Sequence, residues 1–241
     1  MEDVVIVERD GPIERLTLNR PDRGNMLTIA MVAGLTEQIE RSGRDPDLKA
    51  IVLTGAGEDF CRGRDPEGAP ERAPRTALEM RTDLTAPILG FYTAVRGAEV
   101  PVVAVVRGLA NGFGCAAAAV CDVTIADADA RFALPEMKHD LPPTLAMCAH
   151  IDRTMPKSIG WLVYSMRELN AATAQSLGFV SHVAAAGGLD ADVDAFLAAL
   201  AERDRDSLAT CKTYLANARL METDKASDYA GNLLSVIMSS R

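Results

Sequence analysis

The chain has 241 residues, of which 48% are hydrophobic and 24% charged, as in ordinary water-soluble globular proteins. Its formal net charge is −9, and no basic stripe stands out locally, which argues against a nucleic-acid partner. No stretch approaches the roughly 18–20 uncharged apolar residues of a transmembrane helix, so we expect no membrane partner.

Cysteine and histidine usage argues against a disulfide framework and a metal site. The five cysteines are an odd number, and no pair has C-x-x-C spacing. The opening residues MEDVVIVERD do not resemble a secretory signal, so we expect a reduced, cytoplasmic setting. The three histidines, His139, His150 and His182, lie far apart or unpaired. We therefore expect neither a metal nor a redox cofactor.

Short β-rich runs alternate with helical patterns through the first part of the chain. Residues 4–8 and 13–19 flank the turn sequence RDGP and predict a hairpin. Further extended segments are expected at 48–55, 102–106, 122–127 and 130–136. Apolar spacing and composition predict helices over 28–43, 75–97, 115–121, 143–153, 157–165, 171–177, 189–202, 206–218 and 226–240.

This order predicts an α/β core followed by a helical extension. We place the core in residues 1–185 and the C-terminal helical region in residues 186–241. The extension is too thin to fold alone, so we expect it to pack on the core or on another subunit.

The segment VVAVVRGLANGFGCAAAAVCD (102–122) joins an apolar strand, a glycine turn and a row of alanines. GFGCAA fits the dinucleotide pattern G-x-G-x-x-A, but a dinucleotide-binding unit needs about 30 residues and a longer helix. A second interpretation is that amide N–H groups at the start of the helix meet a carbonyl oxygen, as in an oxyanion hole. A second amide donor could come from FCRGRD (60–65).

Four motifs carry a family resemblance: NRP at 19–21, IVLTG…FCRGRD, PVVAVVRGLANGFG…CD and ARFALPE. In this order and spacing the chain resembles the enoyl-CoA hydratase/isomerase (crotonase) superfamily over essentially its whole length. The resemblance implies an α/β fold with a crotonase-like ββα spiral core and a C-terminal helical trimerisation region. It also implies an acyl-CoA substrate, no cofactor beyond that coenzyme A, and a homotrimer or a hexamer (dimer of trimers).

The resemblance places the two oxyanion amides on Arg64 and Phe113. Only the N–H acts there, so Phe113 is tolerable in the middle of GFG, although glycine would suit the expected backbone conformation better. The substrate-binding positions implied around these amides are Arg62, Gly63, Asp65, Gly112, Gly114, Ala116 and His139.

The acid/base positions depart from the usual family pattern. Hydratases of this family carry two glutamates, whose positions here are Ala116 and Glu136, 20 residues apart. Adding water to a double bond needs one group to orient water and one to protonate carbon. Moving a double bond needs one carboxylate, so the single Glu136 favours double-bond isomerisation. Glu136 would need a partly buried site that raises its pKa.

Alternatives remain open. Asp140 or His139 could replace the missing acid in a hydratase, a hydrolase or a C–C bond-cleaving member, and a non-catalytic homologue could bind coenzyme A. Each of these residues also has a purely structural interpretation. Glu136 is then a turn residue, Asp140 is the N-cap of the helix from Pro142, and His139 is a solvated loop residue.

Other side chains near the motifs have structural interpretations as well. We expect Cys61 and Cys115 to be buried packing groups, and Asp65 to fix its loop by hydrogen bonds. Coenzyme A phosphates could be met by Arg23, Arg62 and Arg64, although exposed surface arginines are commoner. The helical spacing of Trp161 and Tyr164 favours a core or subunit contact.

Overall fold

The computed structural model describes residues 4–67 and 76–239. A six-stranded sheet has the order β1-β2-β3-β4-β6-β9 and a second sheet the order β5-β7-β8. Only β1 is antiparallel to its neighbour in the larger sheet. The strands are β1 (Val5–Asp10), β2 (Ile13–Leu18), β3 (Ala50–Gly55), β4 (Val102–Val106), β5 (Leu109–Asn111), β6 (Val123–Ala126), β7 (Arg131–Ala133), β8 (Leu169–Asn170) and β9 (His182–Val183).

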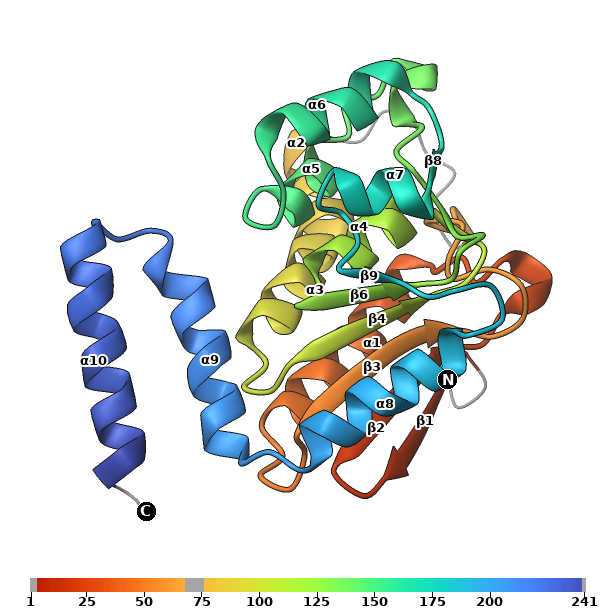
Figure 1. Ribbon diagram of the computed structural model, residues 1–241. Coiled ribbons are helices and arrows are strands. Elements are labelled where there is room, and N and C mark those ends of the chain that lie inside the picture. Colours follow the sequence, from red (N-terminus) through yellow and green to blue (C-terminus); the bar gives the residue numbers. More distant parts are fainter. Residues whose placement is uncertain (1–3, 68–75, 240–241) are drawn as a thin grey trace.

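Helices cover the larger sheet and make up the C-terminal region (Figure 1). The α-helices are α1 (Ile29–Gly43), α2 (Ala77–Met80), α3 (Ala86–Gly97), α4 (Phe113–Val120), α5 (Thr144–His150), α6 (Pro156–Ser165), α7 (Ala171–Ser176), α8 (Leu189–Ala201), α9 (Arg205–Ala218) and α10 (Thr223–Ser239). Two 3-10 turns, η1 (Pro21–Arg23) and η3 (Glu136–His139), and one π-helical turn, η2 (Arg81–Thr85), complete the helical elements.

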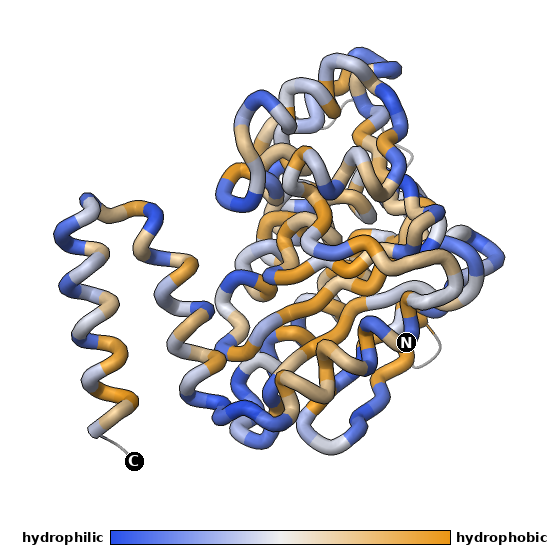
Figure 2. The backbone as a smooth tube through the Cα atoms, in the orientation of Figure 1, coloured by the Kyte–Doolittle hydropathy of each residue, from blue (hydrophilic) through white to orange (hydrophobic). Residues whose placement is uncertain are grey.

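The central strands are apolar on both faces because both faces are covered. On one face, Leu189, Val193 and Leu197 of α8 pack in a cluster with Val52 and Val103. The main core lies on the other face, under α1, α3 and α4. Figure 2 shows the matching hydrophobic colouring of the strands. The expected α/β core is therefore confirmed, with α8 packed on the sheet.

The helix expected over 75–97 is interrupted, and residue 75 lies outside the described residues. Its middle turn, η2, is π-helical, and the Ala86 amide donates to the Arg81 carbonyl, five residues back. Pro87 follows directly and has no N–H to donate to the preceding turn. A proline at this place explains why the regular helix gives way to a wider turn.

Other boundaries differ from the sequence-based expectations by a few residues. The helix expected at 143–153 ends as an α-helix at His150. Strands β5, β8 and β9 were not expected, because two or three residues are too short to show an alternation. Trp161 and Tyr164 are 52% and 76% exposed, so neither belongs to the core of this chain. A subunit contact for them stays a prediction.

Helices α9 and α10 form an arm that stands away from the body (Figure 1). The arm is tethered by Lys212 of α9, which is 8% exposed. Its Nζ donates to the carbonyls of Val95 and Val100 at 2.9 and 3.0 Å and pairs with Asp122 Oδ2 at 2.8 Å.

No helix within the described ranges has the length and apolar character to cross a membrane.

We expect Lys212→Met to destabilise the protein by about 3–5 kcal/mol, because removing one member of a buried ion pair leaves the other uncompensated. Chemical denaturation measures this change. Lys225→Met is the matched control, because Lys225 is exposed on α10 and its Nζ forms a long, exposed pair of 3.9 Å with Asp224. This variant should lower the free energy of unfolding by about 0–1 kcal/mol. Equal stability of the two variants would contradict the tether.

Candidate active site

Two loops that follow neighbouring strands of the larger sheet lie edge to edge. The loop after β3 contains Cys61, which forms an isolated β-bridge with Ala110 of β5. The Asn111 amide donates to the Cys61 carbonyl at 2.9 Å. The Asn111 side chain donates to the Arg62 carbonyl at 3.1 Å. Backbone hydrogen bonds therefore fix the relative position of the segments 61–65 and 109–114.

Gly114 permits this close approach. A Cβ atom on Gly114 would lie 2.1 Å from the Cys61 carbonyl oxygen, a distance that no side chain could accept. Gly63, on the facing loop, adopts φ +120 and lies against the Asn111 carbonyl, a conformation that favours glycine. Both glycines are required by the backbone geometry of the site.

The two candidate oxyanion amides belong to these loops. The Gly63 carbonyl accepts from Leu27, and the Asp65 amide donates to the Leu27 carbonyl, which leaves the Arg64 N–H between them unused. Phe113 is the first residue of α4, where N–H groups lack an intrahelical acceptor. Within residues 4–67 and 76–239, neither amide has a hydrogen-bond acceptor. Both are available to an incoming oxygen.

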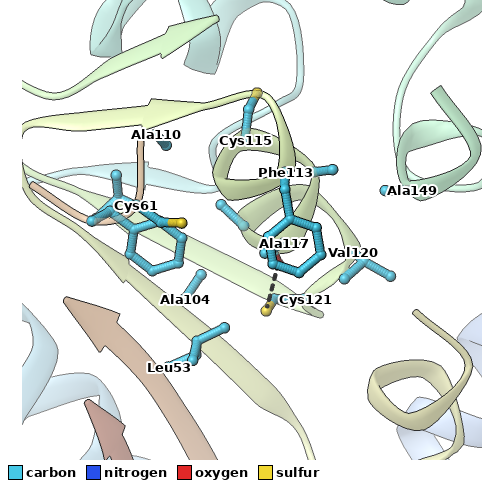
Figure 3. Packing of buried hydrophobic residues seen from close by; sticks show 14 of the residues in the cluster. Leu53, Cys61, Ala104, Ala110, Phe113, Cys115, Ala117, Val120, Cys121 and Ala149 are labelled. Atoms are coloured by element: carbon cyan, nitrogen blue, oxygen red, sulfur yellow. Dashed lines mark hydrogen bonds between the residues drawn. The ribbon is translucent and has the colours of Figure 1, made fainter. Parts of the chain in front are cut away.

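Phe113 carries no backbone strain, contrary to the concern raised by the sequence. It is absent from the residues with positive φ, and Gly112 takes the left-handed conformation instead, with φ +52. The Phe113 ring is 8% exposed and packs on Phe91 with ring centroids 5.4 Å apart. Figure 3 shows the ring among the buried residues around α4. The aromatic side chain therefore packs in the core, while the amide of the same residue has no acceptor among the described residues.

Glu136 lies beside the start of α4. It begins η3, and its Oε1 is 3.2 Å from the position that a Cβ on Gly112 would occupy. Its Oε2 is buried without a hydrogen-bond partner among the described residues. Burial raises the pKa of the Glu136 carboxyl above its ordinary value, because a charged carboxylate is poorly solvated there. These are the properties of a carboxylate prepared to accept a proton.

Ala116 lies one turn into α4. It is fully buried, and its amide donates to the Gly112 carbonyl at 3.0 Å. The side chain at this position, where the family resemblance implies the first of the two glutamates, is therefore a buried methyl group.

Asp140 and His139 are exposed, in contrast to the partly buried Glu136 at the start of the same turn. Asp140 adopts a left-handed conformation at the end of η3, with φ +56. The expected N-cap role of Asp140 is wrong, because α5 begins after Pro143 and has no side-chain cap. Neither carboxylate nor imidazole makes a hydrogen bond to a described residue, so nothing orients them toward Glu136.

Charged residues hold the loop that carries Arg64. Asp65 is 3% exposed and accepts from the Glu67 amide at 3.0 Å. It also pairs with Arg20 Nη1 at 2.9 Å. The prediction that Asp65 fixes its loop is confirmed, and direct contact of Asp65 with a substrate stays a prediction.

The arginines considered for phosphate binding differ in whether they already have a carboxylate partner. Arg23 and Arg62 line a surface cleft of about 540 Å³, but each has a carboxylate partner. Arg62 Nε lies 2.5 Å from Asp59, and Arg23 Nη1 lies 3.7 Å from Asp65. Arg64 is exposed, and its guanidinium forms no ion pair or hydrogen bond with the described part of the chain. Within the described ranges, Arg64 is therefore the only one of these three arginines without a carboxylate partner.

Two buried polar residues that organise the site were missed by the sequence reading. Asp59 Oδ1 accepts from the Leu109 amide at 2.8 Å and so joins the two loops. The Asn25 side chain donates to the carbonyls of Ala56 and Asp59. In the sequence, each is merely a polar residue within a glycine-containing turn. The backbone groups to which they are hydrogen-bonded cannot be read from the sequence.

The cysteines near the site are packing groups, as expected. Burial raises the pKa of both Cys61 and Cys115 to about 12, so both are thiols at neutral pH. Among the described residues, no group of three or more histidine, cysteine, aspartate or glutamate side chains is placed to hold a metal ion.

Two free amides and one desolvated carboxylate suit the removal of a proton next to a carbonyl group, because the amides stabilise the resulting oxyanion. The model of the enoyl-CoA hydratase/isomerase family matches residues 8–240. The chain belongs to the enoyl-CoA hydratase/isomerase family. The family's acyl-CoA chemistry is consistent with this pair of amides, and the crotonase-type fold expected from the sequence is confirmed.

Similar proteins agree with the family. A probable enoyl-CoA hydratase of Mycobacterium tuberculosis is 32% identical over 188 residues, covering 78% of this chain and 71% of that protein. The 2,3-dehydroadipyl-CoA hydratase of Escherichia coli is 33% identical over 181 residues, covering 74% of this chain and 68% of that protein. The crystal structure of a Mycobacterium smegmatis enoyl-CoA hydratase has a TM-score of 0.89 at 28% identity, covering 98% and 91% of the two chains.

The contribution of the Arg64 amide can be tested with a matched pair of variants. Arg64→Pro removes the N–H, whereas Arg64→Ala keeps it and removes only the side chain. We expect Arg64→Pro to lower kcat by about 10²–10³, the cost of one oxyanion donor, and Arg64→Ala to keep kcat. Thermal unfolding checks that both variants are folded. Equal kcat for the two folded variants would exclude an oxyanion role for this amide.

Proposed function

We propose that this family member isomerises a double bond in the acyl group of an acyl-CoA thioester. The observation that carries the proposal is the single buried carboxylate oxygen, Glu136 Oε2, which has no partner among the described residues, together with a methyl group at Ala116. One proton acceptor is enough to take a proton from one carbon and return it to another.

The proposed steps balance as follows. The thioester oxygen of a 3-enoyl-CoA accepts hydrogen bonds from the Arg64 and Phe113 amides. The Glu136 carboxylate takes a proton from C2, the electron pair of that C–H bond forms a C1=C2 double bond, and the carbonyl π pair moves onto the thioester oxygen. Glu136 then gives the proton to C4, where the C3=C4 π pair forms the new C–H bond. The oxygen pair re-forms the carbonyl, and the C1=C2 pair moves to C2=C3. The base is regenerated and no co-reactant is needed.

The raised pKa of Glu136 supports this use of the residue. A carboxylate near its ordinary pKa is a weak base toward carbon acids, and desolvation strengthens it. The two amides offset the cost by stabilising the negative charge as it forms on the thioester oxygen. Ionised Glu136 is the active form, so the acidic limb of the rate profile should lie above the ordinary pKa of a glutamate.

Hydration is the second candidate, because the curated relatives described above are named hydratases. It would need a group besides Glu136 to handle the water. Asp140 and His139 are the alternatives that the sequence offers, and both are exposed. Isomerisation is therefore the better supported candidate.

The two candidates separate on substrate. We expect turnover of a 3-enoyl-CoA, and we expect Glu136→Gln to lower it by about 10²–10⁴ because the proton carrier is lost. Glu40→Gln, at an exposed position on α1, is the matched control and should keep full turnover. Product formation is followed by chromatography of the CoA esters. Turnover of crotonyl-CoA without turnover of the 3-enoyl ester would refute isomerisation, and an active Glu136→Gln variant would remove Glu136 from the mechanism.

We also propose that the arm of α9 and α10 packs on a second copy of the chain, as in a trimer. Helix α10 has no buried residue, and its Leu234, Val236 and Met238 are 59%, 64% and 69% exposed. An apolar groove of about 400 Å³ also runs between the two helices. This much exposed apolar surface supports an association site.

Leu234→Glu tests the association, because it places a charge on that apolar face. Ser235→Glu is the matched control at the neighbouring exposed position. We expect sedimentation velocity to show a trimer, or a hexamer, for the wild type and the control, and a smaller species for Leu234→Glu. A monomeric wild type would overturn the proposal.

A further inference from the structure

Arg64 carries a second functional group besides its amide, and the mechanism above does not use it. Its guanidinium is exposed and forms no ion pair or hydrogen bond with a described residue. The nearby Arg20 and Arg62 are in contrast paired with Asp65 and Asp59. The chain has 34 acidic and 25 basic residues, so a shortage of carboxylates does not explain why this guanidinium has no partner in the described structure.

The backbone of the segment 61–65 fixes the side of the loop on which the guanidinium lies. An isolated β-bridge joins Arg64 to Leu27, and burial alternates along the segment, with the odd-numbered residues buried and the two arginines exposed. This is the pattern of an extended chain, whose successive side chains point to opposite faces. The Arg64 side chain therefore lies on the open face of the loop, opposite the buried Asp65 carboxylate.

The same bridge sets the direction of the Arg64 amide. The Gly63 carbonyl accepts from the Leu27 amide at 3.1 Å, and the Asp65 amide donates to the Leu27 carbonyl at 2.8 Å. Successive N–H groups of an extended chain point to opposite edges, so the Arg64 N–H points away from Leu27. An oxygen held by this N–H lies within one arginine side chain of a positive charge.

We propose that the Arg64 guanidinium binds a carboxylate at the far end of the acyl group, so that the preferred substrate is the CoA monothioester of an unsaturated dicarboxylic acid. The inference deepens the proposed function and rests on one part of it, the placement of the thioester oxygen at the Arg64 amide. The planar guanidinium can donate two parallel hydrogen bonds to a carboxylate.

The length of an arginine side chain suits a six-carbon acyl group. In Arg64 the backbone nitrogen and the guanidinium carbon are joined through the Cα, three methylene groups and Nε. The thioester oxygen and the terminal carboxyl carbon of a six-carbon acyl group are separated by the same number of covalent bonds. With the oxygen at the amide, the terminal carboxylate can therefore reach the guanidinium when the two chains run side by side.

The phosphates of coenzyme A are the other anions that an acyl-CoA carries. They are separated from the thioester by the whole pantetheine arm, which is much longer than an arginine side chain. A phosphate contact would also be common to all acyl-CoA esters, whereas a carboxylate contact discriminates among acyl groups. The carboxylate is therefore the anion that we assign to Arg64, and the experiment below separates the two.

The binding test uses hexanedioyl-CoA and hexanoyl-CoA, saturated esters that cannot be isomerised and that differ only at the end of the acyl chain. Isothermal titration calorimetry gives Kd for the wild type, for Arg64→Ala and for Arg44→Ala, the matched control at an exposed arginine that ends α1. We expect the wild type and the control to bind hexanedioyl-CoA about 10-fold more tightly than hexanoyl-CoA, as hydrogen bonds to a charged group do. Arg64→Ala should lose this preference.

Two binding results would overturn the inference. One is the same ratio of the two Kd values in the wild type and in Arg64→Ala. The other is an equal loss of affinity in Arg64→Ala for both esters and for free coenzyme A, which would assign the guanidinium to a phosphate.

Turnover provides a second measurement with the 3-enoyl forms of the same two esters. We expect the wild type to show the higher kcat/KM for hex-3-enedioyl-CoA, and Arg64→Ala to lose the difference mainly through KM, because the carboxylate is bound equally in the ground state and the transition state. A preference in Kd without isomerisation of either ester would refute the proposed function and leave this inference standing. Isomerisation of both esters without a preference in Kd or kcat/KM would refute this inference alone.

Discussion

The contact between the Cα of Gly114 and the carbonyl of Cys61 sets the geometry of the site. A single Cβ at this position would approach that oxygen to 2.1 Å, so any larger residue would push the two loops apart. With glycine, the start of α4 and the segment 61–65 come together, and the amides of Phe113 and Arg64 have no acceptor among the described residues. The glycine at position 114 therefore follows from the need for close packing of two backbone segments.

The groups around this contact are unsatisfied in a complementary way. In the part of the chain that the structure describes, two amide donors lack acceptors, and one buried carboxylate oxygen, on Glu136, lacks a donor. Each arrangement costs stability in the free protein. A thioester with an acidic C–H bond compensates both, because its oxygen accepts from the amides and its proton goes to the carboxylate. The unpaired polar groups therefore lie together at the site, whereas the nearby side chains of Asp59, Asp65 and Asn25 have hydrogen-bond partners.

Much of this could be predicted from the sequence because the site depends on local motifs. The family resemblance placed the candidate oxyanion amides on Arg64 and Phe113, and it could do so because the resemblance is carried by short glycine-containing motifs in fixed order. What was missed depends on contacts between distant segments. The hydrogen bond from Leu109 to Asp59 and the short strand β8 have no local signal. The π-helical turn before Pro87 had a signal in that proline, but helical periodicity concealed it.

The C-terminal arm is tied by charge to the helices that frame the site. Besides the buried Lys212, Arg219, directly after α9, has its Nη2 3.4 Å from Asp152, and Asp152 is also bound to Arg96 of α3. Arg96 in turn donates to the backbone of α5. Helix α10 has no buried residue, so the anchors of the arm lie on the side of α9. Lys212 is bound to Val95 of α3 and to Asp122 after α4, and Arg219 is paired with Asp152 after α5. If α10 packs on a second copy as proposed, these anchors connect that contact to the segments after α4 and α5.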